Sequence, residues 1–200
     1  MLKIEDYKSV FVVAGLVGVL FFASPAIGAF VRLPEGEKFS ELWILGPGHV
    51  IENYPFNVMV GESYTVYVGV GNHMGASAYY LLCFKLRNQT EPLPNSTAGT
   101  PSPLLPLFAY SVFVEDGKTW EQPLTFSLNS VSFEGNRCLI HNLTINGVAF
   151  DVGKSVLWDS ENNGYFYQLL IELWIYNASS RDFYFHNRFV YFWLNVTVAV

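Results

Sequence analysis

Charged side chains are scarce in this sequence of 200 residues, of which only 14% are Asp, Glu, Lys or Arg. Basic residues are the rarer kind, 11 against 17 acidic ones, and the formal net charge is −6. Proteins that bind nucleic acid neutralise phosphates with clustered Lys and Arg, so we expect no nucleic-acid partner. Hydrophobic residues make up 51% of the chain, which excludes intrinsic disorder and leaves enough apolar surface for a core.

Cysteine is almost absent, since Cys83 and Cys138 are the only two in the chain. Two cysteines alone cannot supply a structural zinc site. They lie in separate apolar segments that could form facing or neighbouring strands, so we expect a disulfide between them. It would close a loop of about 55 residues and stabilise the fold by about 3–4 kcal/mol. The alternative is a pair of buried thiols that pack as small apolar side chains.

Local signatures of catalysis are missing as well. The chain has no Gly-x-Ser-x-Gly, no Gly-x-x-x-x-Gly-Lys and no His-Glu-x-x-His, the motifs of serine hydrolases, phosphate-binding loops and zinc proteases. The segment from Gly69 to Gly75 has Met74 where a dinucleotide-binding loop needs glycine, so we interpret it as a turn. Asp159 and Glu161 share one turn, whereas glycosidase carboxylates converge from separate elements. We therefore expect no enzyme activity, no catalytic residue and no cofactor.

Histidine is the remaining candidate metal ligand, and the chain has four of them: His49, His73, His141 and His186. Copper takes imidazole and thioether ligands, so a copper-binding domain is one hypothesis. No two of these histidines have the spacing of paired ligands. We expect ordinary strand and loop histidines and no metal site.

One long segment has no charge at all: the 22 residues from Val10 to Val31. As a helix it would be about 33 Å long at ~1.5 Å per residue, enough to cross a hydrocarbon core of ~30 Å. The small residues that follow Pro25 leave signal-peptide cleavage open, which would release the same domain as a secreted protein. The segments we expect are a short cytoplasmic tail (1–9), a transmembrane helix or signal anchor (10–31), a linker (32–37) and an extracellular domain (38–200). The localisation that follows is a single-pass protein of the cell membrane with its C-terminal domain outside.

Acceptor sites for N-glycosylation are in excess. Five Asn-X-Ser/Thr sequons are present, against roughly 1.6 expected from the Ser and Thr content. An excess of sequons after an export segment supports an extracellular domain that carries N-linked glycans. The acceptor residues are Asn88, Asn95, Asn142, Asn177 and Asn195.

The rest of the chain has the pattern of β-strands separated by turns. From Ser63 to Asn72, Tyr64 and the valines at alternate positions lie on one face of a half-buried strand. Residues 77–87 are apolar on both faces until Lys85 and Arg87, which is typical of an interior strand. Asp116-Gly117 and Asn146-Gly147 predict hairpin turns. Residues 165–176 and 183–198 predict two long strands joined by a polar turn, although residues 168–174 could also be helical.

Half of the ten prolines fall between Glu91 and Leu107, which predicts an extended surface loop between strands. The strands on either side of this loop are too few to form separate cores, and the chain has no internal repeat. We therefore expect one all-β domain, an immunoglobulin-like β-sandwich, over residues 38–200.

Aromatic residues are abundant at 17% of the chain, and runs such as 165–167 and 183–185 are aromatic on both faces of a strand. One face can fill the core of a sandwich. The other is covered by the proline-rich loop and glycans, or it forms a binding surface.

Several sequence blocks resemble an archaeal family of membrane-anchored proteins known only as domain of unknown function number sixteen-sixteen. The resemblance extends from Lys8 to Asn195 and implies an archaeal envelope protein with an anchored, extracellular, β-rich domain. That family has no established activity, so no catalytic residue is implied. The blocks are Ser40-Glu-Leu-Trp-Ile-Leu-Gly-Pro47, Tyr54-Pro-Phe-Asn-Val58, Gly69-Val-Gly-Asn-His-Met-Gly75, Ser77-Ala-Tyr-Tyr80, Arg87-Asn-Gln-Thr90, Pro92-Leu-Pro-Asn95, His186-Asn-Arg-Phe-Val190 and Trp193-Leu-Asn195.

These observations predict a structural or interaction module of the archaeal cell envelope that acts by protein–protein contact, with a second copy or another envelope protein as partner. The alternative is a glycan- or peptide-binding accessory subunit of a membrane transporter or enzyme complex. Exposed coplanar aromatic rings beside polar side chains would favour binding. A self-complementary exposed strand edge would favour assembly, and converging histidines would favour copper.

Overall fold

The computed structural model describes residues 7–30 and 37–197, with the backbone alone for residues 25–30. The chain divides into two compact units, Met1–Glu37 and Lys38–Val200. Residues 1–6 of the expected tail and residues 32–36 of the expected linker lie outside the described residues.

The first unit contains helix α1, Lys8–Phe30, in which Ser24 and Pro25 do not interrupt the helical backbone. Among the described residues, no helix is both long enough and apolar enough to cross a membrane. The membrane segment expected over residues 10–31 is described only in part, because residue 31 and the side chains of residues 25–30 lie outside the described part of the chain.

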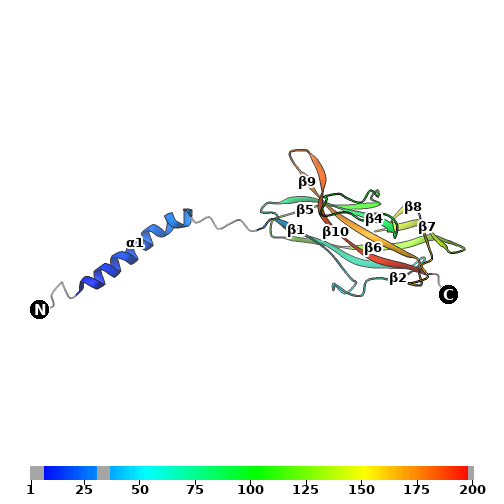
Figure 1. Cartoon of the computed structure of the whole chain (residues 1–200), viewed down its shortest axis with the longest axis horizontal. Helices are drawn as coiled ribbons and strands as arrows, with labels where there is room; N and C mark the ends of the chain where they lie inside the picture. Colours follow the sequence, from blue (N-terminus) through cyan, green and yellow to red (C-terminus); the bar gives the residue numbers. More distant parts are fainter. Residues whose placement is uncertain (1–6, 31–36, 198–200) are drawn as a thin grey trace. The chain divides into compact units, whose positions relative to one another are not determined.

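The second unit is all-β, as predicted, and consists of two five-stranded sheets (Figure 1). Neighbouring strands are antiparallel, except that β2 and β10 are parallel. In order across the first sheet, the strands are β1 (Phe39–Leu45), β3 (Ser63–His73), β6 (Thr119–Glu134), β7 (Arg137–Ile145) and β8 (Val148–Leu157). In order across the second sheet, they are β2 (Asn57–Met59), β10 (Asp182–Thr197), β9 (Phe166–Asn177), β4 (Ala78–Asn88) and β5 (Phe108–Val114).

The hydrophobic core lies between the two sheets and follows the alternation of the strands. Val66, Val68 and Val70 of β3 are fully buried, which confirms the face predicted for this strand. Across from them, β4 and β9 contribute alternate residues such as Phe84 and Leu169, also fully buried. Since side chains of a strand alternate between its faces, the residues between them in β4 and β9 face outward.

Two features of the C-terminal half confirm the sequence prediction. Asn146 and Gly147 connect β7 to β8, with Ile145 paired to Val148 and positive φ angles of 49° and 80° at the two turn residues. That conformation is the type I′ hairpin favoured by Asn-Gly. Strands β9 and β10 pair along their length across a polar turn, so residues 168–174 are strand and not helix.

The hairpin predicted at Asp116-Gly117 is wrong. Strand β5 before this turn pairs with β4 in the second sheet, whereas β6 after it pairs with β3 and β7 in the first sheet. The turn therefore crosses from one sheet to the other, and its backbone bonds to the end of β3, with Gly117 N donating to Asn72 O at 2.7 Å. An Asp-Gly turn reverses the chain, but it does not decide which sheet the next strand joins.

The turn predicted for Gly69 to Gly75 is also wrong in its first half, because β3 continues to His73. Gly69 pairs with Trp43 of β1, and a side chain at Gly69 would overlap the indole ring of Trp43. The glycine is required there by this close approach, not by a turn.

The disulfide predicted between Cys83 and Cys138 is wrong, because both residues are free, buried thiols. Cys83 lies on β4 between the inward-facing Leu82 and Phe84, so it points to the outer face of the second sheet. Cys138 of β7 belongs to the core between the sheets. Burial raises the pKa of each thiol to about 11, which matches the alternative of inert, packed cysteines.

Candidate functional site

Strand edges are the first candidate contact sites, since an unpaired edge can accept another strand. Among the ten described strands, four lie at sheet edges: β1, β8, β2 and β5. Strand β2 has only three residues. Strand β8 contains Asp151 and Lys154, and its pairing with β7 is shifted by an irregularity. On β1, the carbonyl of Ile44 accepts a hydrogen bond from the Tyr54 hydroxyl at 2.8 Å.

Strand β5 is longer than β2 and lacks the charges and the register shift of β8, and the one side-chain hydrogen bond to its backbone lies at its last residue, where the Val114 carbonyl accepts from Asn72 Nδ2 at 2.8 Å. Its seven residues, Phe-Ala-Tyr-Ser-Val-Phe-Val, include no charge and no proline, and its register with β4 runs without a shift. The outward-facing side chains of Ala109, Ser111 and Phe113 are exposed, and Phe113 is 65% exposed. This edge is open to an additional strand.

The proline-rich loop between β4 and β5 covers part of the outer face of the second sheet, as predicted for a surface connection. Beneath it, Lys85 Nζ donates to Glu172 Oε2 at 2.7 Å and to the Ser102 carbonyl at 2.8 Å. Glu172 Oε1 accepts a hydrogen bond from Ser102 N at 2.7 Å. The side chains of Lys85 and Glu172 are 3% and 0% exposed, so this ion pair joins the loop to β4 and β9 in a buried setting.

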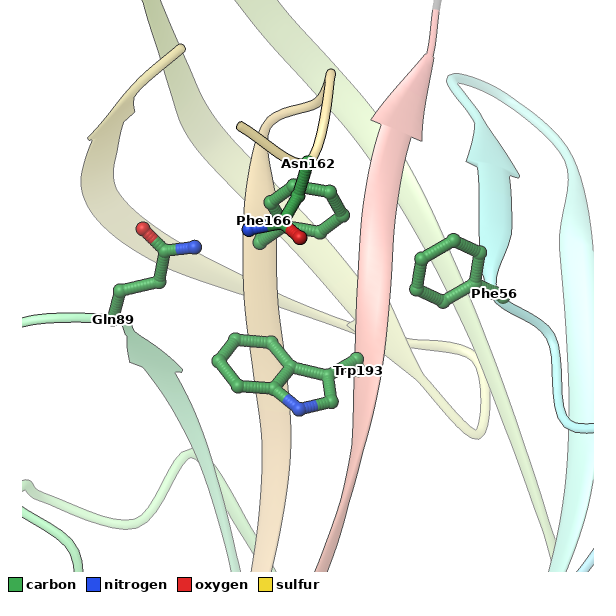
Figure 2. Close-up of a pocket in the computed structure, with 5 residues that line it drawn as sticks. All are labelled: Phe56, Gln89, Asn162, Phe166 and Trp193. Carbon is green, nitrogen blue, oxygen red and sulfur yellow. The ribbon is translucent and has the colours of Figure 1, made fainter. Parts of the chain in front are cut away.

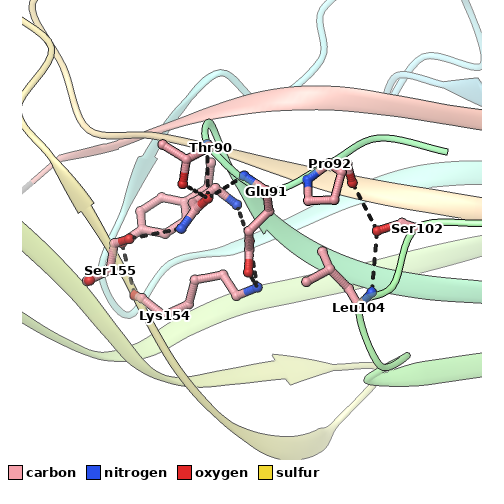
Figure 3. A network of polar contacts seen from close by, with 9 residues as sticks. Thr90, Glu91, Pro92, Ser102, Leu104, Lys154 and Ser155 are labelled. Atoms are coloured by element: carbon pink, nitrogen blue, oxygen red, sulfur yellow. Dashed lines mark hydrogen bonds and ion pairs between the residues drawn. The ribbon is translucent and has the colours of Figure 1, made fainter.

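A second set of polar contacts holds the start of the same loop (Figure 3). Glu91 accepts from Lys154 Nζ of β8 at 2.6 and 2.7 Å. Ser102 Oγ donates to the Pro92 carbonyl at 3.1 Å and accepts from Leu104 N at 3.4 Å. These contacts attach Glu91 to β8 and Ser102 to the Pro92 carbonyl, so they fix the loop against the domain.

An uncovered part of this outer face forms a hollow of about 370 Å³, lined by Phe56, Gln89, Asn162, Phe166 and Trp193 (Figure 2). Phe166 is buried, whereas Phe56 is 48% and Trp193 38% exposed. The rings of Phe166 and Trp193 are 87° apart with centroids at 6.4 Å. The aromatic rings therefore form a corner, and not the coplanar platform named above as a mark of binding.

The two amides of the hollow are oriented by Asp159. Asn162 Nδ2 and Gln89 Nε2 both donate to Asp159 Oδ2, at 2.9 and 3.3 Å. Hydrogen bonds from Asn162 lower the pKa of the Asp159 carboxyl below its ordinary value. In the described part of the chain, the carbonyl oxygens of both amides and the indole N–H of Trp193 have no hydrogen-bond partner. In Figure 2 the Gln89 amide oxygen points away from the other lining side chains, so the polar groups left for a ligand are the carbonyl oxygen of Asn162 and the indole N–H of Trp193. None of the five lining side chains is charged.

The four histidines do not converge. His49 Nδ1 lies 3.0 Å from Glu121 Oε1, and His73 lies beside Glu41. His141 hydrogen-bonds Ser132, while His186 hydrogen-bonds Ser40, and burial lowers the pKa of the His186 imidazole. Within residues 7–30 and 37–197, no group of three or more His, Cys, Asp or Glu side chains could hold a metal ion.

The asparagine side chains of the five sequons differ in exposure and in hydrogen bonding. Asn95, which forms an isolated β-bridge with Thr100, and Asn177, the last residue of β9, are exposed. Asn88 and Asn142 are half-buried, and their amides donate to Ser155 and Asp151. Asn195, also half-buried, donates from Nδ2 to Asn57 Oδ1 at 3.0 Å and accepts from Tyr165 N at 3.1 Å.

Solved structures similar to this chain include parts of large glycoside hydrolases, at low similarity. A β-glucosidase from Listeria innocua in complex with gluconolactone is 12% identical, with a TM-score of 0.38, over 80% of this chain and 16% of that one. A family 123 glycoside hydrolase from Clostridium perfringens is 8% identical, with a TM-score of 0.35, over 81% of this chain and 28% of that one. The chain thus spans less than a third of the length of these enzymes, and the likeness carries no functional argument. No curated protein sequence matches the chain.

One family profile, described as "Domain of unknown function (DUF1616)", matches residues 33–139. That range is shorter than the resemblance from Lys8 to Asn195 described above, but it covers more than half of the 200 residues. The chain therefore belongs to the DUF1616 family, whose domain has no known function.

Proposed function

We propose that this protein is a membrane-anchored, extracellular module of the archaeal cell envelope that works by contact between copies of itself, without catalysis. The observation that carries the proposal is the free edge of β5, which has no charge, no proline and no bulge. Natural edge strands usually contain a charge, a proline or a bulge, because an edge without them pairs with strands of other molecules. An edge left open in this way is suited to assembly.

Strand β5 is complementary to a second copy of itself. If two copies pair antiparallel about Ser111, Phe113 of each copy lies opposite Ala109 of the other, a large side chain against a small one. Glu115, the first charge after the strand, then lies opposite Leu107, so no carboxylates face each other. Cross-strand pairs of this kind contribute roughly 0.2–1 kcal/mol each, in addition to the ladder of backbone hydrogen bonds.

The membrane anchor is part of the proposal and is supported by the N-terminal segment. Val10 to Val31 is uncharged, and the side chains of Phe21 and Phe22 on α1 are 78% and 90% exposed. Large apolar side chains that remain exposed along a helix mark a surface for lipid or another apolar partner. The excess of sequons supports an extracellular location for the domain.

Replacing Ser111 with lysine is expected to abolish self-association of the full-length chain in mild detergent. The substitution places two ammonium groups opposite each other at the centre of the paired strands, and like charges there are destabilising. The mass of the complex, measured by light scattering after size exclusion, is expected to fall from that of a dimer to that of a monomer.

The matched control is Ser130→Lys, which introduces the same charge at an exposed serine of the interior strand β6 and should leave the dimer intact. Ser111→Cys is expected to form an intermolecular disulfide, because Cβ atoms directly opposite in paired strands lie about 4.5–5.5 Å apart. Cys83 and Cys138 should not compete, since burial raises their pKa values to about 11. A monomeric wild type, or a dimer that survives Ser111→Lys, contradicts the proposal.

Glycan occupancy tests the extracellular location. In protein extracted from native membranes, we expect glycans at Asn95 and Asn177, whose amides are exposed, and none at Asn195, whose amide is held by Asn57 and Tyr165. Mass spectrometry of tryptic glycopeptides measures this directly. Protein without any glycan, recovered from the soluble fraction, would argue against both the location and the anchor.

A further inference from the structure

We infer that the hollow beside Trp193 is a binding site for one sugar unit of a neutral glycan, independent of the contact between copies proposed above. The elements that build it come from distant parts of the chain. Trp193 lies on β10, Phe166 on β9 and Gln89 just after β4, while Phe56 precedes β2 and Asn162 lies in the turn before β9 (Figure 2). The volume of about 370 Å³ falls within the range of small-ligand sites, roughly 300–1,000 Å³.

The polar groups of the hollow select for hydroxyl groups. Asp159 accepts hydrogen bonds from the amide N–H groups of Asn162 and Gln89, which leaves the carbonyl oxygen of Asn162 as an acceptor in the hollow (Figure 2). A hydroxyl group can donate to this acceptor, and a hydroxyl or ring oxygen can accept from the indole N–H of Trp193. A ligand without hydroxyl donors would leave the acceptor unpaired, which costs free energy once it is buried.

The aromatic rings select for a ligand with apolar faces as well. Phe166 forms the buried floor, and Trp193 stands at 87° to it, so a ring seated in the corner contacts one aromatic face and one aromatic edge. A sugar ring combines C–H faces with hydroxyl groups at its rim, and therefore fits both sets of contacts. Aromatic side chains dominate the energetics of such buried contacts.

Charge excludes the main competing ligands. None of the five lining side chains is charged, while Asp159 lies just behind the amides and the chain carries a net charge of −6. An anionic sugar, a nucleotide or a phosphopeptide would bring further negative charge without an Arg or Lys in the lining to pair with it. The ligand is therefore a neutral one.

The surface around the first hollow contains further hollows on both sides, beyond the length of one sugar unit. Phe56 and Trp193 also line a second hollow of about 540 Å³ beside Tyr191. Gln89 also lines a third, of about 470 Å³, beside Trp158, whose lining includes the charged side chains of Arg137 and Asp159, so the path is uncharged only toward Tyr191. Hollows that share lining residues form a path along the surface, which suits consecutive units of a chain better than an isolated monosaccharide.

The test is a titration of the full-length protein in mild detergent with cellohexaose, chitohexaose and mannohexaose, followed by tryptophan fluorescence and calorimetry. Hexagalacturonate serves as the anionic comparison, and N-glycans released from the protein itself distinguish a glycoprotein source from an envelope polysaccharide. We expect saturable binding of at least one neutral glycan and none of hexagalacturonate.

Two variants on the same strand provide the matched comparison. Tyr191→Ala removes an aromatic side chain that lines the neighbouring hollow and is 41% exposed, whereas Tyr184→Ala removes one outside the path that is 47% exposed. We expect Trp193→Ala and Tyr191→Ala each to weaken binding about tenfold, which corresponds to about 1.4 kcal/mol, and Tyr184→Ala to leave it unchanged. Ser111→Lys should bind like wild type, which separates this site from the contact between copies.

Two results would overturn the inference. One is the absence of saturable binding to every neutral glycan tested, up to about 10 mM, where any remaining affinity is weaker than that of a specific site. The other is binding that Trp193→Ala and Tyr191→Ala leave as strong as in Tyr184→Ala.

Discussion

Replacing Glu172 with glutamine is expected to lower the free energy of unfolding by about 3 kcal/mol, because it leaves a buried ammonium without its counter-charge. Lys85 is 3% exposed in its side chain, and its remaining partners would be the Ser102 carbonyl and a neutral amide oxygen. Ser102 N and Trp174 Nε1 donate to the Glu172 carboxylate, and the substitution gives both a weaker acceptor. Urea denaturation of the full-length chain in mild detergent, followed by tryptophan fluorescence, measures the loss.

The matched control is the second ion pair of the same loop, Glu91 with Lys154, whose side chains are 25% and 15% exposed. Glu91→Gln should cost no more than about 1 kcal/mol, because water screens a partly exposed pair. Removing both buried charges in Lys85→Met/Glu172→Leu should recover only part of the loss, because no unpaired charge remains but Ser102 N and Trp174 Nε1 lose their acceptor. If Glu172→Gln and Glu91→Gln lower the free energy of unfolding equally, burial of the Lys85–Glu172 pair does not determine its contribution to stability.

Replacing Asn72 with alanine is expected to cost about 3 kcal/mol, since it strips several buried groups of their partners. Asn72 is fully buried at the end of β3. Its Nδ2 donates to the carbonyls of Ala76 and Val114, both at 2.8 Å, and its Oδ1 accepts from Met74 N at 3.0 Å and the Tyr80 hydroxyl at 3.1 Å. Val114 ends β5, so this one side chain joins the two sheets where the chain crosses between them.

The Asn72→Asp substitution separates the hydrogen-bond donor function of the Asn72 side chain from its acceptor function. The carboxylate keeps both acceptors but cannot donate to the Ala76 and Val114 carbonyls, so we expect a loss at least as large as that of alanine. Asn129→Ala, at an exposed asparagine of β6, should change the free energy of unfolding by no more than about 0.5 kcal/mol. A similar midpoint of urea denaturation in Asn72→Ala and Asn129→Ala would refute the prediction that the Asn72 side chain stabilises the fold by joining the two sheets.

Strands with a strong local pattern were predictable from the sequence. Strand β3 alternates Val66, Val68 and Val70 with polar or small residues, and burial of one face produces that alternation directly. The β7–β8 hairpin was predictable for a similar reason, because Asn146-Gly147 adopts the positive φ angles of its turn within two residues. Local chemistry determines these elements.

Strands that depend on a distant partner were not predictable. Strand β1 packs Trp43 onto Gly69, and β2 exists only through three parallel pairs with β10. Neither has a pattern long enough to show a period. The free thiols were not predictable for the same reason. The side to which Cys83 points depends on which face of β4 packs against the core.

The sequence by itself determined that this chain forms an all-β domain after an uncharged N-terminal segment, because strand periodicity and the length of an apolar run are local properties. Only the tertiary structure decided which strand edge is left open and which residues share a site. Ser111 is exposed at an edge because β5 joins the second sheet while β6 joins the first. Phe56, Asn162 and Trp193 line one hollow because sheet pairing brings together residues far apart in the chain, and contacts at such separations leave no spacing in the sequence to detect.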